Sequence, residues 1–257
     1  MKIVLNADDF GYDADTLRAT IDCFEHGALT SATIMANMPE TPAAIEYARS
    51  HPQFSFGVHL IYVSTGTERP ICDPKDVPAL CDADGKLLDF YEVRRRVLKK
   101  AIPRVQIEKE TRAQIEFIRS QGVPISHVDS HHHVHKFGPF LSVLEKVLPD
   151  YGIRRLRTVQ DTYLKPKYTS PIYWFGWLLH RRIARSFATT QHFFMATCRE
   201  DMRQLDQLVP RLKGDSIEVG VHPGQSEEWR NDERTGAIAF AAKARAAGHQ
   251  LISWNGV

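Results

Sequence analysis

The feature that most constrains the fold is the alternation of short apolar segments with longer amphipathic segments along the chain. The short segments have the length of buried strands, and the longer ones repeat apolar side chains every three or four residues, as a helix face does. This alternation predicts a parallel sheet whose strands are joined by helical crossovers, closed or nearly closed into a barrel. We expect strands at 2–7, 30–37, 54–60, 125–130, 153–159, 216–224 and 249–254.

The segments between these strands divide into predicted helices and one long loop. Residues 61–89 are rich in Pro, Asp and Gly and are expected to form a loop, whereas 165–187 reads as irregular or helical. A chain of 257 residues without an internal repeat or a low-complexity linker is typical of one α/β barrel domain. We predict a single domain over 1–257, a (β/α) barrel that is distorted or incomplete relative to a TIM barrel. Helices are expected at 15–28, 41–51, 89–101, 107–121, 140–152, 201–212 and 236–248.

The composition narrows the classes of partner and compartment. The net charge is +2, so no strong field for a polyanion is expected and nucleic-acid binding is not predicted. The 4 cysteines are scattered without a C-x-x-C pair, which favours a reducing cytoplasm. Two aspartates stand near the N-terminus where a secretory signal would be apolar, and no apolar run reaches the roughly 20 residues that span a bilayer.

Polar residues capable of chemistry stand at the ends of several predicted strands. Asp8 and Asp9 end the first strand, Asn37 the second and His59 the third, and His222 ends a later one. In β/α barrels the active site lies at the C-terminal ends of the strands and draws residues from several of them. These separate segments are therefore expected to meet at one mouth of the barrel.

Alternation within the strands supports this arrangement, because successive side chains point to opposite faces of a strand. Small and polar residues share one side of each strand, and large apolar residues share the other. Asp129 lies on the same side as His131, and Glu218 lies on the same side as His222. A barrel interior that leads to a polar mouth, with helices packed outside, explains this division.

The segment "HVDSHHHVH", residues 127–135, contains the densest group of candidate ligands. A tract of adjacent histidines can be an exposed metal-scavenging loop, so geometry must distinguish its members. His131 follows the strand directly and is in parity with Asp129, so it is the first candidate ligand. His135 is the second, because positions i and i+4 share a side in both helix and strand, whereas His132 falls opposite His131 in an extended chain. Asp129 is expected to orient a ligand by hydrogen bonding.

Taken singly, each of these segments has an ordinary structural explanation, such as a turn, a helix cap or a hydrogen-bonded histidine. Taken together, an aspartate and two histidines from separate strands predict a divalent-metal site with open positions for water and substrate. Two imidazoles and one carboxylate favour Zn²⁺ by affinity.

The motifs themselves are similar to those of a known family. "LNADDFG", "SATIMAN", "GVHL", "HVDSHHHVH" and "VHPG" occur in this order and cover nearly the whole chain. In this respect the sequence resembles the YdjC-like carbohydrate deacetylases, which include chitooligosaccharide deacetylases and the deacetylases associated with hopanoid biosynthesis.

The resemblance implies a β/α-barrel deacetylase fold and one divalent metal ion, commonly Mg²⁺ in the family, with Zn²⁺ left open by the ligand chemistry. On this sequence the ligands would be Asp9, His59 and His131. Asp8 would be the general base and His222 the general acid in hydrolysis of the linear amide C–N bond of an N-acetylated amino sugar, which releases acetate. Parity alone sets Asp8 inward and leaves Asp9 unplaced, so the division of roles between the two aspartates stays open.

Other residues are candidates for supporting this chemistry from around the site. They would orient the catalytic groups or contact the substrate, and they are Asn37, Asp129, His135 and Arg157.

Residues 170–187 indicate a different kind of contact, because aromatic residues there precede a run of arginines. Trp174 and Trp177 could grip a sugar or a lipid-linked sugar, or lie on an anionic bilayer. The substrate would then be a glycolipid rather than a chitooligosaccharide, and the protein would be cytoplasmic and associated with the inner membrane surface. The segment fits equally well a buried helix or one that forms a homodimer.

Three other functions compete with carbohydrate N-deacetylation. A metal-dependent phosphoesterase can use an Asp/His cluster on a barrel in the same way. A cyclic amidohydrolase is less well supported, because the first strand has no H-x-H motif. A non-catalytic metal- or glycan-binding relative is the remaining alternative, although binding alone would not require Asp8 and His222.

Overall fold

The computed structural model describes residues 1–164, 171–197 and 204–257, with the side chains of 171–173 left aside. All strand pairs in its single sheet are parallel, in the order β4-β3-β2-β1-β6-β5. β7 pairs with the first residues of β1, and β2 pairs further along it. The strands are β1 (Lys2–Phe10), β2 (Ser31–Ile34), β3 (Ser55–Leu60), β4 (Ile125–Ser130), β5 (His192–Met195), β6 (Ser216–Val221) and β7 (Gln250–Leu251).

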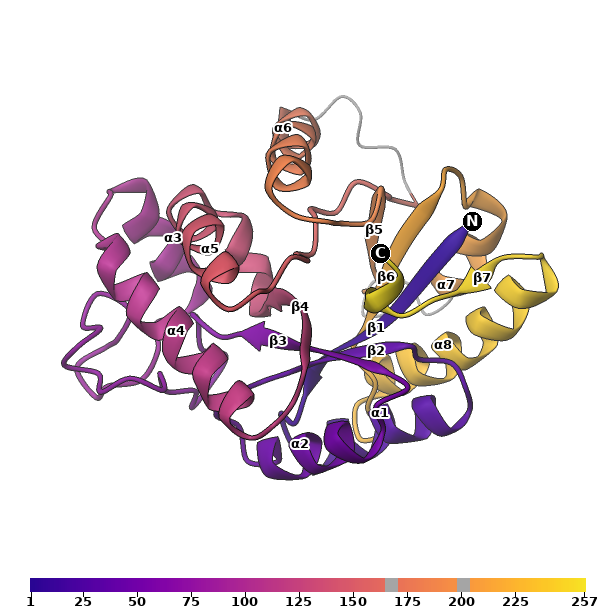
Figure 1. Ribbon diagram of the computed structural model, residues 1–257, viewed down its shortest axis with the longest axis horizontal. Coiled ribbons are helices and arrows are strands. Elements are labelled where there is room, and N and C mark those ends of the chain that lie inside the picture. Colours follow the sequence, from indigo (N-terminus) through magenta and orange to yellow (C-terminus); the bar gives the residue numbers. More distant parts are fainter. Residues whose placement is uncertain (165–170, 198–203) are drawn as a thin grey trace.

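Helices connect and cover the strands, as the alternation in the sequence predicts. Figure 1 shows α1, α2 and α8 along one side of the curled sheet, α3, α4 and α5 grouped beyond β3 and β4, and α6 projecting on the side opposite α1 and α2. The α-helices are α1 (Ala14–Glu25), α2 (Thr41–Ser50), α3 (Phe90–Leu98), α4 (Arg104–Ser120), α5 (Gly138–Asp150), α6 (Pro171–Ser186), α7 (Gln204–Leu208) and α8 (Glu228–Ala246). The short 3₁₀ segments are η1 (His131–Lys136), η2 (Val209–Arg211) and η3 (Trp254–Gly256).

The gap between β4 and β5 is spanned by an irregular segment, so the barrel is distorted as expected. Val128 N donates to the Arg155 carbonyl (3.1 Å) and Arg157 N to the Val128 carbonyl (3.0 Å) on the β4 side. Asp161 and Thr162 donate backbone N–H groups to the Phe193 carbonyl on the β5 side (3.3 and 3.2 Å). The predicted strand 153–159 is therefore wrong as a continuous strand. The chain crosses from one edge to the other within a few residues, and it makes only isolated bridges.

Other boundaries differ in ways that matter for the site. β1 runs three residues beyond the predicted 2–7 and includes both aspartates at positions 8 and 9. β5 was not predicted as a strand, and α8 begins eight residues before the predicted 236–248. The predicted loop 61–89 contains no helix or strand, with one isolated bridge between Cys81 and Leu87.

A column of polar side chains occupies the interior of the curled sheet, which confirms the parity argument. Ser31 and Ser55 lie 2.6 Å apart through their hydroxyl oxygens on adjacent strands. Trp254 closes this end of the interior, because its backbone N–H donates to Ser55 Oγ (3.0 Å) and its ring stacks on His127 at 4.6 Å. A Cβ at Gly57 would lie 2.6 Å from the His127 carbonyl oxygen, so only glycine fits here between β3 and β4.

Candidate metal and substrate site

The end of β1 brings two adjacent carboxylates to the same side of the sheet. Asn6 Nδ2 donates to Asp8 Oδ1 (3.0 Å), so these two residues share a side, as alternation requires. Asp9 would point away in a regular strand. It reaches the site because the β1–β2 register shifts between Ala7 and Phe10 and Asp9 takes a left-handed conformation, with φ of 58°. The bend in the chain therefore lies at Asp9 itself.

Asp9, His59 and His131 come together as a buried triad from β1, β3 and the end of β4. Asp9 Oδ1 lies 3.3 Å from His59 Nε2 and 3.0 Å from His131 Nδ1. One potential ligand atom from each residue lies within 4.8 Å of the others. The three residues that resemblance assigns to the metal are thus neighbours, although they are far apart in the sequence.

The chemistry of this triad fits a divalent ion. Asp129 Oδ1 lies 2.7 Å from His59 Nδ1, which leaves Nε2 of the same ring directed at Asp9 and the prospective ion. A carboxylate that holds the far nitrogen of a histidine is the usual support of a metal ligand, because it fixes the tautomer and the ring orientation. His131 Nε2 is buried and has no hydrogen-bond partner among the described residues, so this ring also retains a nitrogen for a ligand role.

Arg157 holds the carboxylates beneath this triad. Its Nη1 and Nη2 donate to the two oxygens of Asp8 (2.6 and 2.7 Å), and Nη1 also lies 2.6 Å from Asp129 Oδ2. Burial alone would raise the pKa of Asp8, but the Arg157 guanidinium outweighs it and lowers that pKa to about 2. Arg157 is itself fully buried and does not line the cavity, so it supports Asp8 and Asp129 and makes no contact with the cavity.

A third carboxylate completes the Arg157 cluster. Glu218 Oε1 accepts from Arg157 Nε (3.0 Å) and Nη2 (2.7 Å) and from Trp254 Nε1 (3.3 Å). The pKa of Glu218 is raised to about 7, mainly by burial and also by the charges of Asp129 and Asp8, while Arg157 opposes this shift. Arg157 is therefore a single cation that contacts all three carboxylates of the cluster.

The histidine tract is neither a helix nor an extended strand. It forms the turn η1, in which His132 and His133 have positive φ values of 52° and 53°. The prediction that His131 and His135 point to the same side is consequently wrong, because it assumed a helix or a strand. His135 is fully buried with Nδ1 2.8 Å from Ser130 Oγ and does not line the cavity, whereas His132 and His133 do.

His222 reaches the same cavity from the end of β6. Its backbone N–H donates to Glu233 Oε2 (2.7 Å), and its Nδ1 lies 3.1 Å from the same oxygen. Burial would lower the pKa of His222, but the charge and hydrogen bond of Glu233 outweigh it and raise that pKa above its ordinary value. Glu233 therefore orients His222 and favours its protonated form.

The cavity has a volume of about 740 Å³ and opens at the C-terminal end of the sheet. It is lined by the two aspartates, by His59, His131 and His222, and by residues from the start of α8, including Trp229, Arg230 and Glu233. These α8 residues were not predicted from the sequence, because that helix begins earlier than its apolar repeat indicates. Asn37 was expected near the site but donates its amide to the Arg69 carbonyl and does not line the cavity, and Thr33 takes the position beside Asp129 and His59.

Arg230 is one of the cavity residues with a buried polar atom that has no hydrogen-bond partner among the described residues. Its Nη2 lies 3.5 Å from Asp9 Oδ2 and its Nε 3.1 Å from Glu227 Oε2, while Nη1 is buried without a hydrogen-bond partner among the described residues. The guanidinium lies 4.6 Å from the Trp229 ring centroid. A Cβ at Gly224 would lie 2.8 Å from Arg230 atoms, so the glycine of "VHPG" leaves room for this side chain. Arg230 therefore offers an N–H donor beside the triad.

Comparison with solved structures defines the class of fold. A putative cellobiose-phosphate cleavage protein from Enterococcus faecalis V583 superposes with a TM-score of 0.78 at 22% identity, over 99% of this chain and 98% of that one. A family 4 carbohydrate esterase from Streptomyces lividans superposes with a TM-score of 0.51 at 11% identity, over 98% and 91% of the two chains. The chain is a single α/β domain with a curled parallel sheet, an incomplete β/α barrel of the type that these proteins share.

Sequence comparison then identifies the family. A family model described as YdjC-like protein matches residues 2–251, so the chain belongs to the YdjC-like family. A carbohydrate deacetylase of Geobacillus stearothermophilus is 36% identical over 159 residues, which are 61% of this chain and 60% of that protein. One from Brevibacillus brevis is 35% identical over 153 residues, 60% of this chain and 58% of that protein. The matched region thus spans about three fifths of the length of these two relatives. A carbohydrate deacetylase of Clostridium beijerinckii is 27% identical over a region that covers 82% of its length.

Proposed function

We propose that the protein is a metal-dependent carbohydrate N-deacetylase that removes the acetyl group from an N-acetylated amino sugar. The observation that carries this proposal is the buried triad Asp9, His59 and His131 at the base of a cavity that also contains His222. The curated relatives are named carbohydrate deacetylases, which supports the same activity. An ordered ligand set beside a histidine suited to act as an acid is what amide hydrolysis requires.

Asp9, His59 and His131 are the residues that hold the ion in this proposal. Zn²⁺ suits two imidazoles and one carboxylate, and Mg²⁺ remains the other candidate. Asp129 and Thr33 keep the His59 ring in place through its Nδ1 atom (2.7 and 3.2 Å). This support leaves one face of the triad directed into the cavity for water and substrate.

Asp8 is the proposed general base. Its low pKa keeps it ionised, and Arg157 fixes both of its oxygens. A carboxylate with such a low pKa is a weak base, so a divalent ion held by the triad would have to increase the acidity of the attacking water, and it would also polarise the acetyl carbonyl. Asp8 then takes the proton at a fixed position.

His222 is the proposed general acid. An amine is a poor leaving group as an anion, so the nitrogen of the substrate must receive a proton as the C–N bond breaks. Glu233 holds Nδ1 of His222 and raises its pKa, so that Nε2 can carry the transferable proton. Acetate and a free amino sugar are the products.

The rim of the cavity supports a sugar substrate. Tyr12 and Trp229 line it and present aromatic rings of the kind that pack against pyranose faces, and Arg230 offers a donor for a hydroxyl or carbonyl oxygen. We propose an N-acetylated glycan or glycolipid, acted on in the cytoplasm. The described cysteines, at positions 23, 72 and 81, are free thiols, which agrees with a reducing compartment.

A panel of N-acetylated sugars and glycolipids, scored for acetate with and without a chelator, tests this proposal. Acetate release that requires the metal is the expected result. Release of phosphate from phosphate esters instead of acetate would establish the phosphoesterase alternative, and metal binding without turnover of any substrate would indicate a non-catalytic binding protein.

The Asp8→Asn variant tests the division of roles between the two aspartates. It is expected to retain bound metal and to lose about 10²–10⁴ in kcat, the usual contribution of a positioned general base. His131→Ala is the matched control, since it should lose the metal itself. If Asp8→Asn lost the metal and kept its turnover per bound ion, Asp8 would be a ligand and not the base.

A further inference from the structure

The large exposed hydrophobic side chains of the described residues are confined to one group of helices. They lie on α3, on the first turn of α4 and on α6, with exposed fractions between 46% and 78%, and they are Tyr91, Leu98, Val105, Trp174, Phe175, Trp177 and Leu178. Scattered exposed apolar residues are ordinary in soluble proteins, whereas a cluster on neighbouring helices points to an interaction surface.

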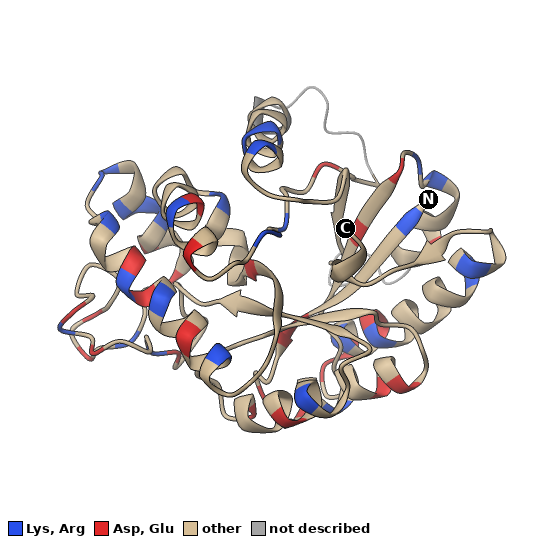
Figure 2. Ribbon diagram, in the orientation of Figure 1, with Lys and Arg blue, Asp and Glu red and all other residues tan. Residues whose placement is uncertain are grey.

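The same helical regions carry an excess of positive charge. Residues 90–105 and 171–186 together contain nine Lys and Arg and one acidic residue, a net charge of +8, against +2 for the whole chain. The remainder of the protein is therefore acidic. Figure 2 shows blue segments on α3 and α6 without red on α6. On α6, Arg181 lies over the Trp177 ring at 4.8 Å, so a cation and an aromatic ring are presented side by side.

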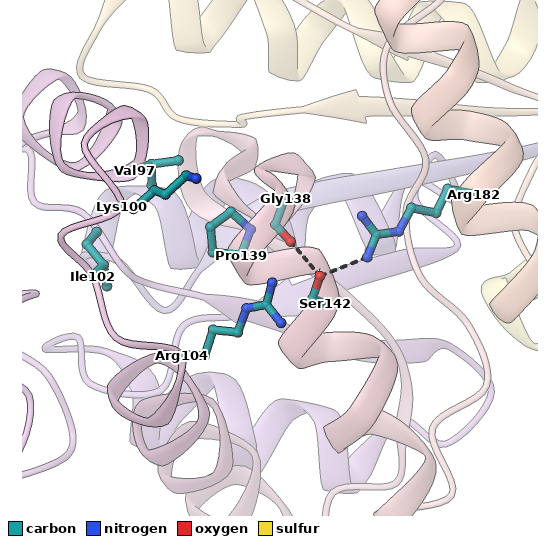
Figure 3. Close-up of a pocket in the computed structure, with 8 residues that line it drawn as sticks. All are labelled: Val97, Lys100, Ile102, Arg104, Gly138, Pro139, Ser142 and Arg182. Atoms are coloured by element: carbon teal, nitrogen blue, oxygen red, sulfur yellow. Dashed lines mark hydrogen bonds between the residues drawn. The ribbon is translucent and has the colours of Figure 1, made fainter.

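A cationic pocket joins these two helical regions. It has a volume of about 570 Å³ and is lined by Lys100 after α3, by Arg104 at the start of α4, by the start of α5, and by Arg182 of α6. Figure 3 shows these cationic side chains around Gly138 and Pro139, with Arg182 held by Ser142 Oγ (2.9 Å). Lys100 and Arg104 are exposed and have no ion-pair partner among the described residues, whereas Arg182 is paired with Glu145. Val97 and Ile102 add apolar walls.

We propose that α3, the first turn of α4 and α6 form a docking surface for an anionic phospholipid membrane, with the Lys100–Arg104–Arg182 pocket receiving a lipid phosphate. Lysine and arginine are attracted to anionic headgroups, and Trp, Phe and Leu enter the boundary between headgroups and acyl chains. Both features occur here on α3 and α6, whose residues line opposite sides of the same pocket beside the start of α5. No helix in the described part of the chain is long and apolar enough to cross a membrane, so the contact is peripheral.

Charge favours a membrane over the other occupants of such a surface. A two-fold dimer through this face would set two strongly cationic surfaces against each other, which costs free energy unless anions intervene. A nucleic acid would satisfy the charge but would leave side chains such as Phe175 and Leu178 without an apolar partner. An anionic bilayer matches both the charge and the apolar side chains.

The docking surface stands on its own observations, and it deepens the proposed function by placing the enzyme where lipid-linked amino sugars occur. The Lys100–Arg104–Arg182 pocket and the Asp9–His59–His131 cavity share no lining residue. Membrane binding can therefore be measured in a variant without deacetylase activity. His131→Ala is expected to bind vesicles as the wild type does, so failure of either proposal is recognised separately.

Co-sedimentation with vesicles is the test. At an ionic strength of about 50 mM the protein should pellet with phosphatidylglycerol vesicles and not with phosphatidylcholine vesicles, and added salt of about 500 mM should weaken binding by screening. Lys100→Glu/Arg104→Glu should lower the affinity at least about tenfold, since each cation near the surface contributes several-fold. Lys75→Glu/Lys213→Glu changes the net charge equally at exposed lysines outside this surface and should bind like the wild type.

The apolar contribution has its own variant. Phe175→Ser/Leu178→Ser removes two exposed side chains without touching the core and should also reduce vesicle binding about tenfold. The proposal is overturned if the wild type does not bind phosphatidylglycerol vesicles. It is also overturned if Lys100→Glu/Arg104→Glu and Lys75→Glu/Lys213→Glu reduce binding to the same extent. It is also overturned if light scattering shows a dimer that these variants dissociate, because the surface is then an interface between two copies. Tight binding of an oligonucleotide in place of vesicles would overturn it in favour of a nucleic acid.

Discussion

Arg157 and the arginines of α6 lie in opposite environments, one buried and the other at the surface. Arg157 is fully buried and touches three carboxylates, those of Asp8, Asp129 and Glu218. The arginines of α6 are on the surface, where Arg181 and Arg185 are exposed. A buried cation is held by geometry and shifts the pKa of its neighbours, whereas exposed cations act together over distance and are screened by salt. The first arrangement can position a catalytic carboxylate, and the second can attract a charged surface.

Among the substitutions that test this contrast, Arg157→Met is expected to have the largest effect, a loss of stability. It would leave buried carboxylates without a counter-charge, and breaking a buried pair in this way costs about 3–5 kcal/mol in the free energy of unfolding. Chemical denaturation measures the loss. Arg182→Met is the matched control, because Arg182 pairs with Glu145 at a side chain that is 38% exposed, and such pairs contribute about 0–1 kcal/mol. Equal losses in the two variants would contradict the buried-cluster interpretation.

Asp129→Asn separates the support of the metal ligand from overall stability. The variant keeps a side chain of the same shape but removes the charge beside His59 Nδ1, and loss of such support typically lowers metal affinity about 10–100-fold. Calorimetric titration with Zn²⁺ measures the affinity. Asp13→Asn is the control, since Asp13 lines the same cavity but caps α1 through Thr16 N, and asparagine preserves that cap. An unchanged affinity in Asp129→Asn would show that His59 is not a ligand oriented by this carboxylate.

That Asp9, His59 and His131 lie close together could be predicted from the sequence because these residues stand at the ends of parallel strands. Asp9, His59 and His131 belong to different strands, and parallel strands present their carboxyl ends at one edge. Alternation also placed Asp129 correctly, as a neighbour of His59 through the sheet register His59–Asp129. Periodicity of two is a local property, so it can be counted along the chain.

What alternation could not predict are the places where the backbone leaves a regular path. The left-handed residues Asp9, His132 and His133 change the direction of a side chain without changing the polarity pattern. Arg230 and Glu233 reach the cavity from the first turns of α8, and that approach depends on how the helix packs rather than on its own sequence. The segment 153–159 was predicted as a strand because it is extended. In the structure it makes only isolated bridges, since the chain there crosses from β4 to β5.

Glu233→Gln tests the effect of Glu233 on the pKa of His222 through the pH dependence of activity. A general acid must be protonated, so activity is lost as the pH rises through the pKa of His222. Glu233 raises that pKa, and its removal should move the alkaline limb of kcat/KM to lower pH, with a smaller effect at acidic pH. The pH profile measures the shift. Glu227→Gln is the control, because Glu227 pairs with Arg230 at the rim, and its limb should stay in place.

The smallest expected effect is the one that surface charge has on chemistry. Lys100→Glu/Arg104→Glu should change kcat/KM toward a soluble N-acetylated sugar less than about twofold and stability by no more than about 0.5 kcal/mol, as is usual for exposed positions. Turnover of the same headgroup on a phosphatidylglycerol vesicle should fall with the loss of vesicle binding. If kcat/KM toward the soluble sugar fell as much as turnover on the vesicle, the cationic surface and the cavity would be coupled. Their separate lining residues argue against such coupling.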